Sequence, residues 1–351
     1  MEQTYDVSRS YQENYDRGPV FETLPPDLPA VPLKEFLGQQ VRSRIGIAAG
    51  LLLNSSWIVG YARRGFDLLT YKTVRSSHRP CYPLPNWVFV EAAEDEPGTY
   101  YVIDGPQTDP TSISSSVCFG MPSMAPEVWR ADVRRAKDAL AEGQLLIVSV
   151  VATPEESWTL GDVADDFVDC ARWAVEAGAD VIEANFSCPN VCSAEGSIYL
   201  DSEASGFIAR EIRRAIGATP LLIKTGYFDG EEKMVSYLRA LNGVADGVTL
   251  VNCIIGKVLH RDGRPAFGEQ FVEAGVLGRT IHDPCVASVS QAASVIVREG
   301  LDLVIAAVGG AAELADVERY FDAGAGAVMM GSAPMYLPNL AAEMKRQRPE
   351  W

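Results

Sequence analysis

Basic side chains are scarce in this chain of 351 residues. Lysine and arginine total 30 against 47 aspartates and glutamates, which leaves a formal net charge of −17 at neutral pH. Because nucleic-acid binding depends on a basic surface that neutralises phosphates, this balance excludes a nucleic-acid partner. Long hydrophobic runs are also missing: the longest, LVIAAVGGAA from Leu303, is shorter than the roughly 20 apolar residues that span a bilayer. We therefore expect no membrane anchor.

A secretory signal is absent as well, since MEQTYDVSRSYQENYDRG at the N-terminus contains no basic region followed by an apolar core. We therefore expect a cytoplasmic protein, in which the sequons at Asn54 and Asn185 are not glycosylated. The seven cysteines form no short-chain disulfide framework and are expected to be reduced. Cys188 and Cys192 lack a second pair of ligands at zinc-like spacing, and no cysteine run suggests an iron–sulfur cluster. We predict no metal site.

What the chain does contain is a regular alternation of apolar strands and amphipathic helices. Its hydrophobic content of 47% is enough to bury a full core. Buried parallel strands appear in a sequence as continuous apolar runs, and we find eight candidates. They are IGIAA (45–49), DLLTYKT (67–73), LLIVSVV (145–151), VIEANFS (181–187), LLIKTG (221–226), GVTLVN (247–252), LVIAAVG (303–309) and AVMMGS (327–332).

Amphipathic stretches such as PEVWRADVRRAKDALAEG and LGDVADDFVDCARWAVEAG separate these runs, and several end at glycine, the residue favoured after helix C-termini. Eight strand–helix units can close into a (β/α)8 or TIM barrel of the α/β class. A doubly wound open sheet is the structural alternative. In a barrel, the reactive residues sit at the C-terminal ends of the strands.

Three segments lie outside this alternation. Residues 1–40 are polar and proline-rich, which predicts an extended N-terminal arm that wraps the domain. Residues 41–351 then form a single barrel domain with insertions at about 74–125 and 253–281. The first insertion contains NWVFVEA and GTYYVID around DEPG, which predicts a β-hairpin after the second strand. Long loops at the C-terminal face usually belong to the active site or its lid.

The tips of the predicted strands carry polar residues and glycines that would converge. Gly309-Gly310 and Gly331-Ser332 end the last two strands, where such barrels commonly bind phosphate through backbone N–H groups. Lys72 and Lys224 end two others, and they could pair with a carboxylate such as Glu183, form a Schiff base, or face an electron-rich cofactor. We favour contact with a cofactor or substrate.

These motifs resemble the dihydroorotate dehydrogenase family, in its cytosolic class with a cysteine base, and also the pyrimidine-reducing domain of dihydropyrimidine dehydrogenase. ANFSCPN resembles the family signature, and IGIAAGLLLN resembles its first strand. LLTYKT and LLIKTG resemble its lysine-bearing strands, and GVTLVN its asparagine-bearing strand. DGRPAFGEQFVEAGVLGRTI resembles the segment before the glycine-rich flavin loop, and AVGG and MMGS resemble the phosphate turns.

The resemblance implies an FMN-dependent oxidoreductase of pyrimidine metabolism that acts on a CH–CH group of dihydroorotate or a related cyclic amide. Cys188 would remove a proton from carbon while the adjacent carbon gives hydride to flavin N5, with Lys72 beside it and Ser187 as a helper. The substrate would contact Lys72, Asn185, Asn190, Asn252, Cys253, Gly120 and Met121. The cofactor would contact Ala48, Ala49, Gly50, Lys72, Thr73, Asn185, Lys224, Asn252, Gly278, Gly309, Gly310, Gly331 and Ser332.

Two departures from the family pattern fall on the substrate side. Val117 stands where the cysteine class has a substrate-binding amide, and Cys253 stands where a serine or threonine usually follows the asparagine. An unpaired buried polar group costs about 1–3 kcal/mol, so both changes weaken the case for orotate itself. A dihydropyrimidine or another unsaturated amide is therefore an alternative substrate.

Two alternatives from other classes are a Schiff-base barrel lyase that uses Lys72 or Lys224 and a non-catalytic flavin-binding protein. No G-x-G-x-x-G follows a strand, so fumarate, a quinone, oxygen or NAD through a partner subunit could each accept the electrons. The family resemblance implies a homodimer.

Overall fold

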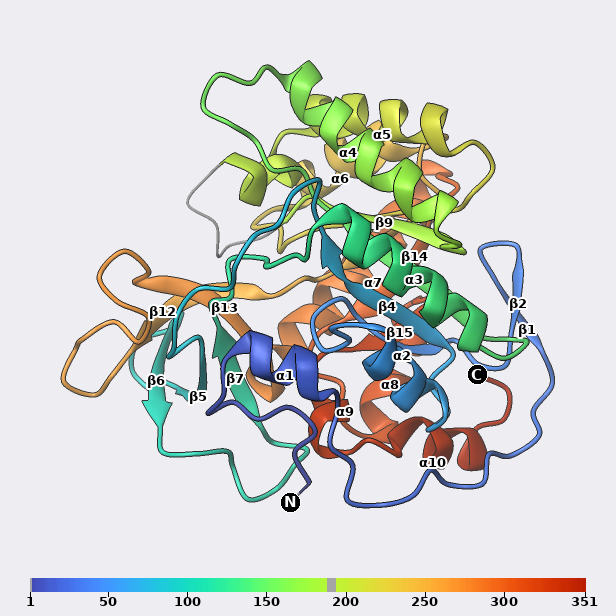
Figure 1. Ribbon diagram of the computed structural model, residues 1–351. Helices are drawn as coiled ribbons and strands as arrows, with labels where there is room; N and C mark the ends of the chain where they lie inside the picture. Colours follow the sequence, from blue (N-terminus) through green and yellow to red (C-terminus); the bar gives the residue numbers. More distant parts are fainter. Residues whose placement is uncertain (1, 188–193) are drawn as a thin grey trace.

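The centre of the computed structural model, which describes residues 2–187 and 194–351, is a closed barrel of eight parallel strands (Figure 1). Neighbouring strands follow the order β10-β11-β14-β15-β3-β4-β8-β9, and β9 pairs with β10 to close the ring. The predicted TIM barrel is confirmed, and the open sheet is excluded. Each strand matches one predicted run, and β4 extends one residue beyond its run: β3 (Ile45–Ile47), β4 (Leu68–Val74), β8 (Leu145–Val150), β9 (Val181–Asn185), β10 (Leu221–Lys224), β11 (Gly247–Leu250), β14 (Val304–Val308) and β15 (Ala327–Met330).

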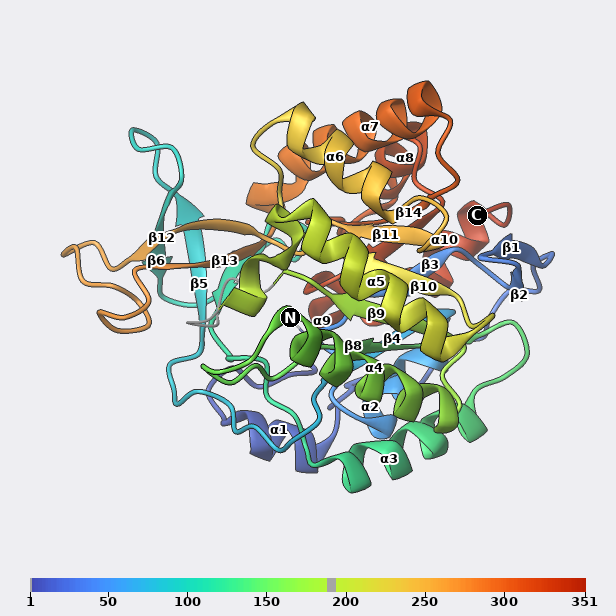
Figure 2. The same ribbon diagram turned by 90° about the horizontal axis from the view of Figure 1, so that it is seen from above.

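Helices surround this barrel, as the view from above shows (Figure 2). Some of them start with a side-chain cap: at α4, the Thr159 hydroxyl accepts from the Asp162 amide at 3.3 Å, and the Asp162 carboxylate accepts from the Thr159 amide at 2.7 Å. The helices are α2 (Ser55–Ala62), α3 (Pro126–Ala139), α4 (Leu160–Glu176), α5 (Ser202–Ile216), α6 (Glu231–Leu241), α7 (His282–Glu299), α8 (Leu314–Asp322), α9 (Ala333–Tyr336) and α10 (Leu340–Gln347), with 3-10 turns η1 (Ala194–Leu200) and η2 (Arg279–Ile281). Within the described ranges, no helix is long and apolar enough to cross a membrane.

The two insertions join in a second, smaller closed barrel, with strand order β12-β13-β7-β5-β6. Antiparallel pairing of β5 with β6 confirms the predicted hairpin. The sequence did not predict that the second insertion would complete the same sheet. This small barrel lies at the opposite end of the main barrel from the β1–β2 hairpin (Figures 1 and 2). The strands are β1 (Lys34–Phe36), β2 (Gln39–Val41), β5 (Trp87–Ala92), β6 (Thr99–Ile103), β7 (Ser114–Val117), β12 (Ile254–Leu259) and β13 (Glu273–Gly278).

The N-terminal arm is not extended throughout, contrary to the prediction. It contains the helix α1 (Tyr11–Arg17) as well as the β1–β2 hairpin. Ser10 and Glu13 form a capping box, in which the Glu13 amide donates to the Ser10 hydroxyl and the Ser10 amide donates to the Glu13 carboxylate. This S-x-x-E pattern is the local reason why a polar arm contains a helical turn.

Candidate active site

The tips of the barrel strands and the inner face of the small barrel line one cavity at the C-terminal end of the main barrel. The small barrel contributes Trp87, Val117 and Leu277. The predicted cofactor residues all lie in the cavity wall, although they come from separate strands and loops: Ala48, Ala49, Gly50, Lys72, Thr73, Asn185, Lys224, Asn252, Gly278, Gly309, Gly310, Gly331 and Ser332. The structure therefore brings together side chains that are far apart in the sequence.

Two buried lysines flank the loop after β3. The Lys224 Nζ donates to the Ala49 carbonyl at 3.4 Å, and the Lys72 Nζ donates to the Gly50 carbonyl at 3.4 Å. The two ammonium groups therefore reach successive carbonyls of one backbone segment. Because their exposed fractions are 2% and 8%, both positive charges lie in a poorly solvated part of the cavity, where electrostatic interactions are strong.

Glu183, a possible ion-pair partner for such a lysine, points into the barrel core and bonds elsewhere. It accepts a hydrogen bond from the Thr249 hydroxyl at 2.8 Å. Its other oxygen, Oε1, is buried and has no hydrogen-bond partner within residues 2–187 and 194–351. The structure thus gives no support to the interpretation of Lys224 as a purely structural partner of Glu183.

Asn185, at the end of β9, and Asn252, just after β11, converge on the cavity from the two strands that flank β10. The side-chain oxygen of Asn185 accepts from the Ser187 amide at 3.1 Å, and the side-chain amide of Asn252 donates to the Ser187 carbonyl. Ser187 is buried and is not among the described residues that line the cavity. Cys188, Asn190 and Cys192 lie outside the described residues, so their predicted roles stay predictions.

Glycines form the opposite end of the cavity, after β13, β14 and β15. Gly310 has a φ of +70°, and a Cβ added there would approach the Gly278 carbonyl oxygen to 2.4 Å, so only glycine lets these backbones come so close. A Cβ at Gly331 would meet no atom within 4 Å, so this backbone faces open space. This end therefore presents backbone groups rather than side chains, as an anion site requires.

Side chains from α7 and α8 hold the glycine turn after β14. The Gly309 carbonyl accepts from Tyr320 Oη at 2.5 Å and from His282 Nδ1 at 3.2 Å. Burial lowers the pKa of His282, and the Asp316 carboxylate, 3.2 Å from Nε2, opposes that shift.

Arg279 is a cavity residue that sequence reasoning missed. It lies next to Gly278 in the wall, and its Nη1 donates to Asp316 Oδ1 at 2.6 Å. Asp316 also accepts from the amides of Ala312 and Glu313, at 3.0 and 3.2 Å. The signal available in the sequence was the arginine directly after the glycine of VLGRTI, at the entrance to α7.

The end of β7 and the segment after it form one wall of the cavity, which contains the predicted substrate contacts Gly120 and Met121. Val117, Phe119, Gly120 and Met121 all line the cavity. Gly120 and Met121 have φ values of +72° and +51°, so this segment turns sharply. The buried Arg75 holds the turn through a hydrogen bond from its Nε to the Met121 carbonyl at 3.0 Å. Cys253 lies in the same wall, buried beside Asn252.

Known proteins with similar sequences agree on one family. A family model described as dihydroorotate dehydrogenase matches residues 116–347. A dihydroorotate dehydrogenase of Dictyostelium discoideum is 33% identical, and the alignment covers 96% of this chain and 95% of that protein. A catalytic subunit of dihydroorotate dehydrogenase B (NAD(+)) from Staphylococcus carnosus is 27% identical over 54% of this chain and 59% of the relative.

A solved structure agrees with the fold. The crystal structure of DHODH from Eimeria tenella in complex with ferulenol has a TM-score of 0.70, and the match covers 93% of this chain and 87% of that one. Its sequence identity is 17%, so this likeness concerns the barrel fold alone. The matched family model and the Dictyostelium relative, which spans nearly the whole chain, carry the assignment further: this chain belongs to the dihydroorotate dehydrogenase family.

Proposed function

We propose that this chain is an FMN-dependent oxidoreductase that removes hydrogen from a CH–CH bond of dihydroorotate or a related cyclic amide. Oxidoreductases acting on CH–CH groups make up this family, and they depend on a flavin. The observation that carries the proposal is the convergence of Lys72, Lys224, Asn185 and Asn252 with the glycine turns on a single cavity. A Schiff-base lyase does not account for the family membership.

The residues present suit FMN at both ends of the cavity. At the glycine end, the backbone of Gly309, Gly310 and Gly331 can donate N–H groups to a phosphate without obstruction by side chains. Lys224 lies away from these turns, at the Ala49 carbonyl, where it would supply positive charge to the N1/O2 edge of the ring. A bound flavin would supply the hydride acceptor, and the chain supplies orientation and electrostatics.

Cys188 is assigned as the base that accepts the proton from the substrate carbon, on the basis of the family signature. Its neighbour in the sequence, Ser187, is buried between the side chains of Asn185 and Asn252. A cysteine thiol can act as a general base once it is ionised. Lys72, Asn185, Asn190 and Asn252 would hold the amide groups of the substrate ring, because amides and an ammonium complement its carbonyl and N–H groups.

The substrate-side wall favours a second, related candidate, in which the ring carries no carboxylate. Val117 lies in this wall without a polar side-chain atom, and Cys253 provides a weaker donor than serine. A buried carboxylate needs several donors, and in this wall they would include the backbone amides around Gly120 and Met121. A dihydropyrimidine or another cyclic imide would demand fewer donors.

We predict that Val117→Asn strengthens the binding of orotate. The added amide can donate to a carboxylate, and a hydrogen bond to a charged group is worth about 1.5–3 kcal/mol, or roughly 10- to 150-fold in affinity. The measurement is the orotate dissociation constant, from the change in flavin absorbance, with Val117→Leu as the control that adds no donor. Unchanged or weaker binding by Val117→Asn would mean that the pocket serves a different ligand.

The proposed function is tested by an absorbance spectrum of the purified protein, followed by anaerobic addition of dihydroorotate. We expect a yellow protein whose flavin band bleaches. Bleaching by a dihydropyrimidine but not by dihydroorotate would select the second candidate. A colourless protein that FMN cannot reconstitute would overturn both.

A further inference from the structure

We propose that Tyr11 of the N-terminal arm is a positioning residue for Lys72, and that the arm thereby acts on the substrate end of the cavity. The proposal rests on the proposed function for the role of Lys72. Its structural basis is a pair of aromatic rings around one ammonium group. The Lys72 Nζ lies 5.0 Å from the ring centroid of Phe119 and 5.5 Å from that of Tyr11.

Both distances fall within the roughly 6 Å at which a cation is attracted to an aromatic face. The attraction is larger where water is excluded, and here Lys72, Tyr11 and Phe119 have exposed fractions of only 8%, 7% and 8%. The two rings also contact each other edge-on, with centroids 6.0 Å apart. Phe119 and Lys72 line the cavity, whereas Tyr11 does not. The arm would therefore act on the substrate through Lys72.

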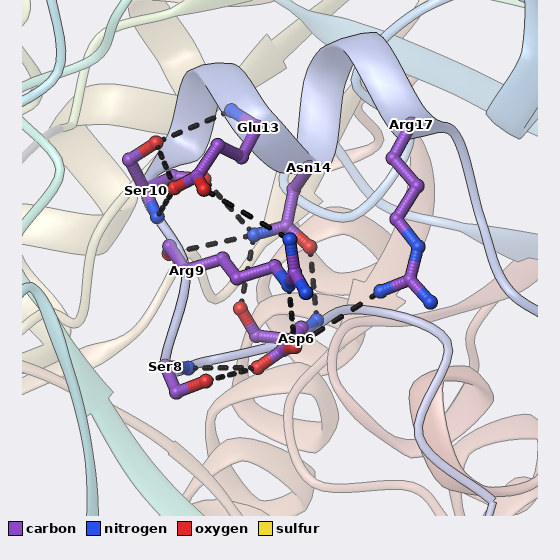
Figure 3. A network of polar contacts seen from close by, with 7 residues as sticks. All are labelled: Asp6, Ser8, Arg9, Ser10, Glu13, Asn14 and Arg17. Carbon is purple, nitrogen blue, oxygen red and sulfur yellow. Dashed lines mark hydrogen bonds and ion pairs between the residues drawn. The ribbon is translucent and has the colours of Figure 1, made fainter.

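Tyr11 is the first residue of α1, and a network of polar contacts surrounds this helix (Figure 3). The buried Asn14 accepts from the Asp6 amide at 2.9 Å and donates to the Asp6 carbonyl at 2.9 Å and the Ser10 carbonyl at 3.0 Å. The capping box of Ser10 with Glu13 starts the helix. A helix of seven residues is not stable by itself, so these bonds give α1 a defined position.

The segment before α1 is fastened to the walls of the cavity. The Tyr5 ring lies 5.6 Å from the ring of Trp87 and 6.2 Å from that of Phe119, and both of these residues line the cavity. The Thr4 amide donates to the Met335 carbonyl at 3.0 Å, next to the cavity residue Tyr336. The arm is therefore packed against the cavity walls at two points, at Trp87 and Phe119 and beside Tyr336.

The test compares three variants of the flavin-loaded protein. Tyr11→Leu removes the ring but keeps an apolar side chain, and Tyr11→Phe keeps the ring. Phe21→Leu is the matched control, because Phe21 is another arm aromatic that stacks on a cation, with Arg64 3.9 Å from its centroid, but it lies outside the cavity wall. The readouts are the dissociation constants of FMN and orotate, the kcat and KM for the substrate that bleaches the flavin, and amine labelling of Lys72 followed by mass spectrometry.

We expect Tyr11→Leu to weaken orotate binding and kcat/KM by roughly tenfold, the effect of losing one desolvated cation–π contact, and to raise labelling of Lys72. FMN affinity should stay within about twofold, and Tyr11→Phe should match the wild type. If Tyr11→Leu behaves as Phe21→Leu does in both ligand binding and labelling, the positioning role is wrong. If neither dihydroorotate nor another dihydropyrimidine reduces the flavin of the wild type, the proposed function fails instead. The labelling comparison alone then decides whether Tyr11 positions Lys72.

Discussion

Cys188→Ala is expected to give a yellow protein whose flavin is reduced about 100- to 10,000-fold more slowly by substrate, the usual loss when a general base is removed. The flavin should remain bound, because the predicted cofactor residues that line the cavity come from other strands and turns. The measurement is the rate of anaerobic bleaching in a stopped-flow instrument, with FMN content determined beforehand. This separates loss of the proton acceptor from loss of the cofactor.

Cys192→Ala is the matched control, since Cys192 lies four residues further along the same segment and has no predicted chemical role. It should retain the wild-type rate. An unchanged rate in Cys188→Ala would remove the base assignment, and an equal loss in both variants would point to the shape of the segment rather than to one thiol.

Lys345→Met is expected to cause the largest loss of stability, about 3–5 kcal/mol in the free energy of unfolding, because it leaves a buried charge without its partner. Lys345 on α10 forms an ion pair with Asp67 just before β4, and the exposed fractions of these residues are 3% and 1%. Ser43 Oγ donates to the same carboxylate at 2.6 Å. Burial raises the pKa of Asp67, and Lys345 opposes that shift, so the carboxylate depends on the ammonium to stay ionised.

The measurement is chemical denaturation of the flavin-loaded protein, with Arg348→Met as the control. Arg348 is the residue after α10, and its ion pair with Glu318 is partly exposed, so its loss should cost less than about 1 kcal/mol. Asp67→Asn combined with Lys345→Met should recover much of the stability, since no unpaired charge remains. A loss in Lys345→Met no larger than in Arg348→Met would contradict this account.

Most of the cavity's cofactor end follows from local sequence. Most of the parallel strands are short apolar runs followed closely by a polar residue or a glycine, and closure of the barrel brings all strand ends to one face. Lys72, Lys224 and Asn252 could therefore be placed in one site before any contact was known, and the structure finds them in its wall.

The substrate end could not be predicted in the same way. Val117 and Trp87 reach the cavity because β7, β5 and the strands of a distant insertion share one small barrel, with Gly275 opposite Val117 in its register. Strands such as β12 contain glycine and are partly exposed, so they leave no clear apolar pattern in the sequence.

By itself, the sequence determined the order of the strands, the barrel class and the residues at the strand tips, because those properties depend on periodicities within a few residues. Tertiary structure decided which distant segments meet: Tyr11 contacts Lys72, Arg279 lies beside the glycine turns, and Lys345 pairs with Asp67. Such contacts depend on packing between segments that are up to hundreds of residues apart, and no local pattern encodes them.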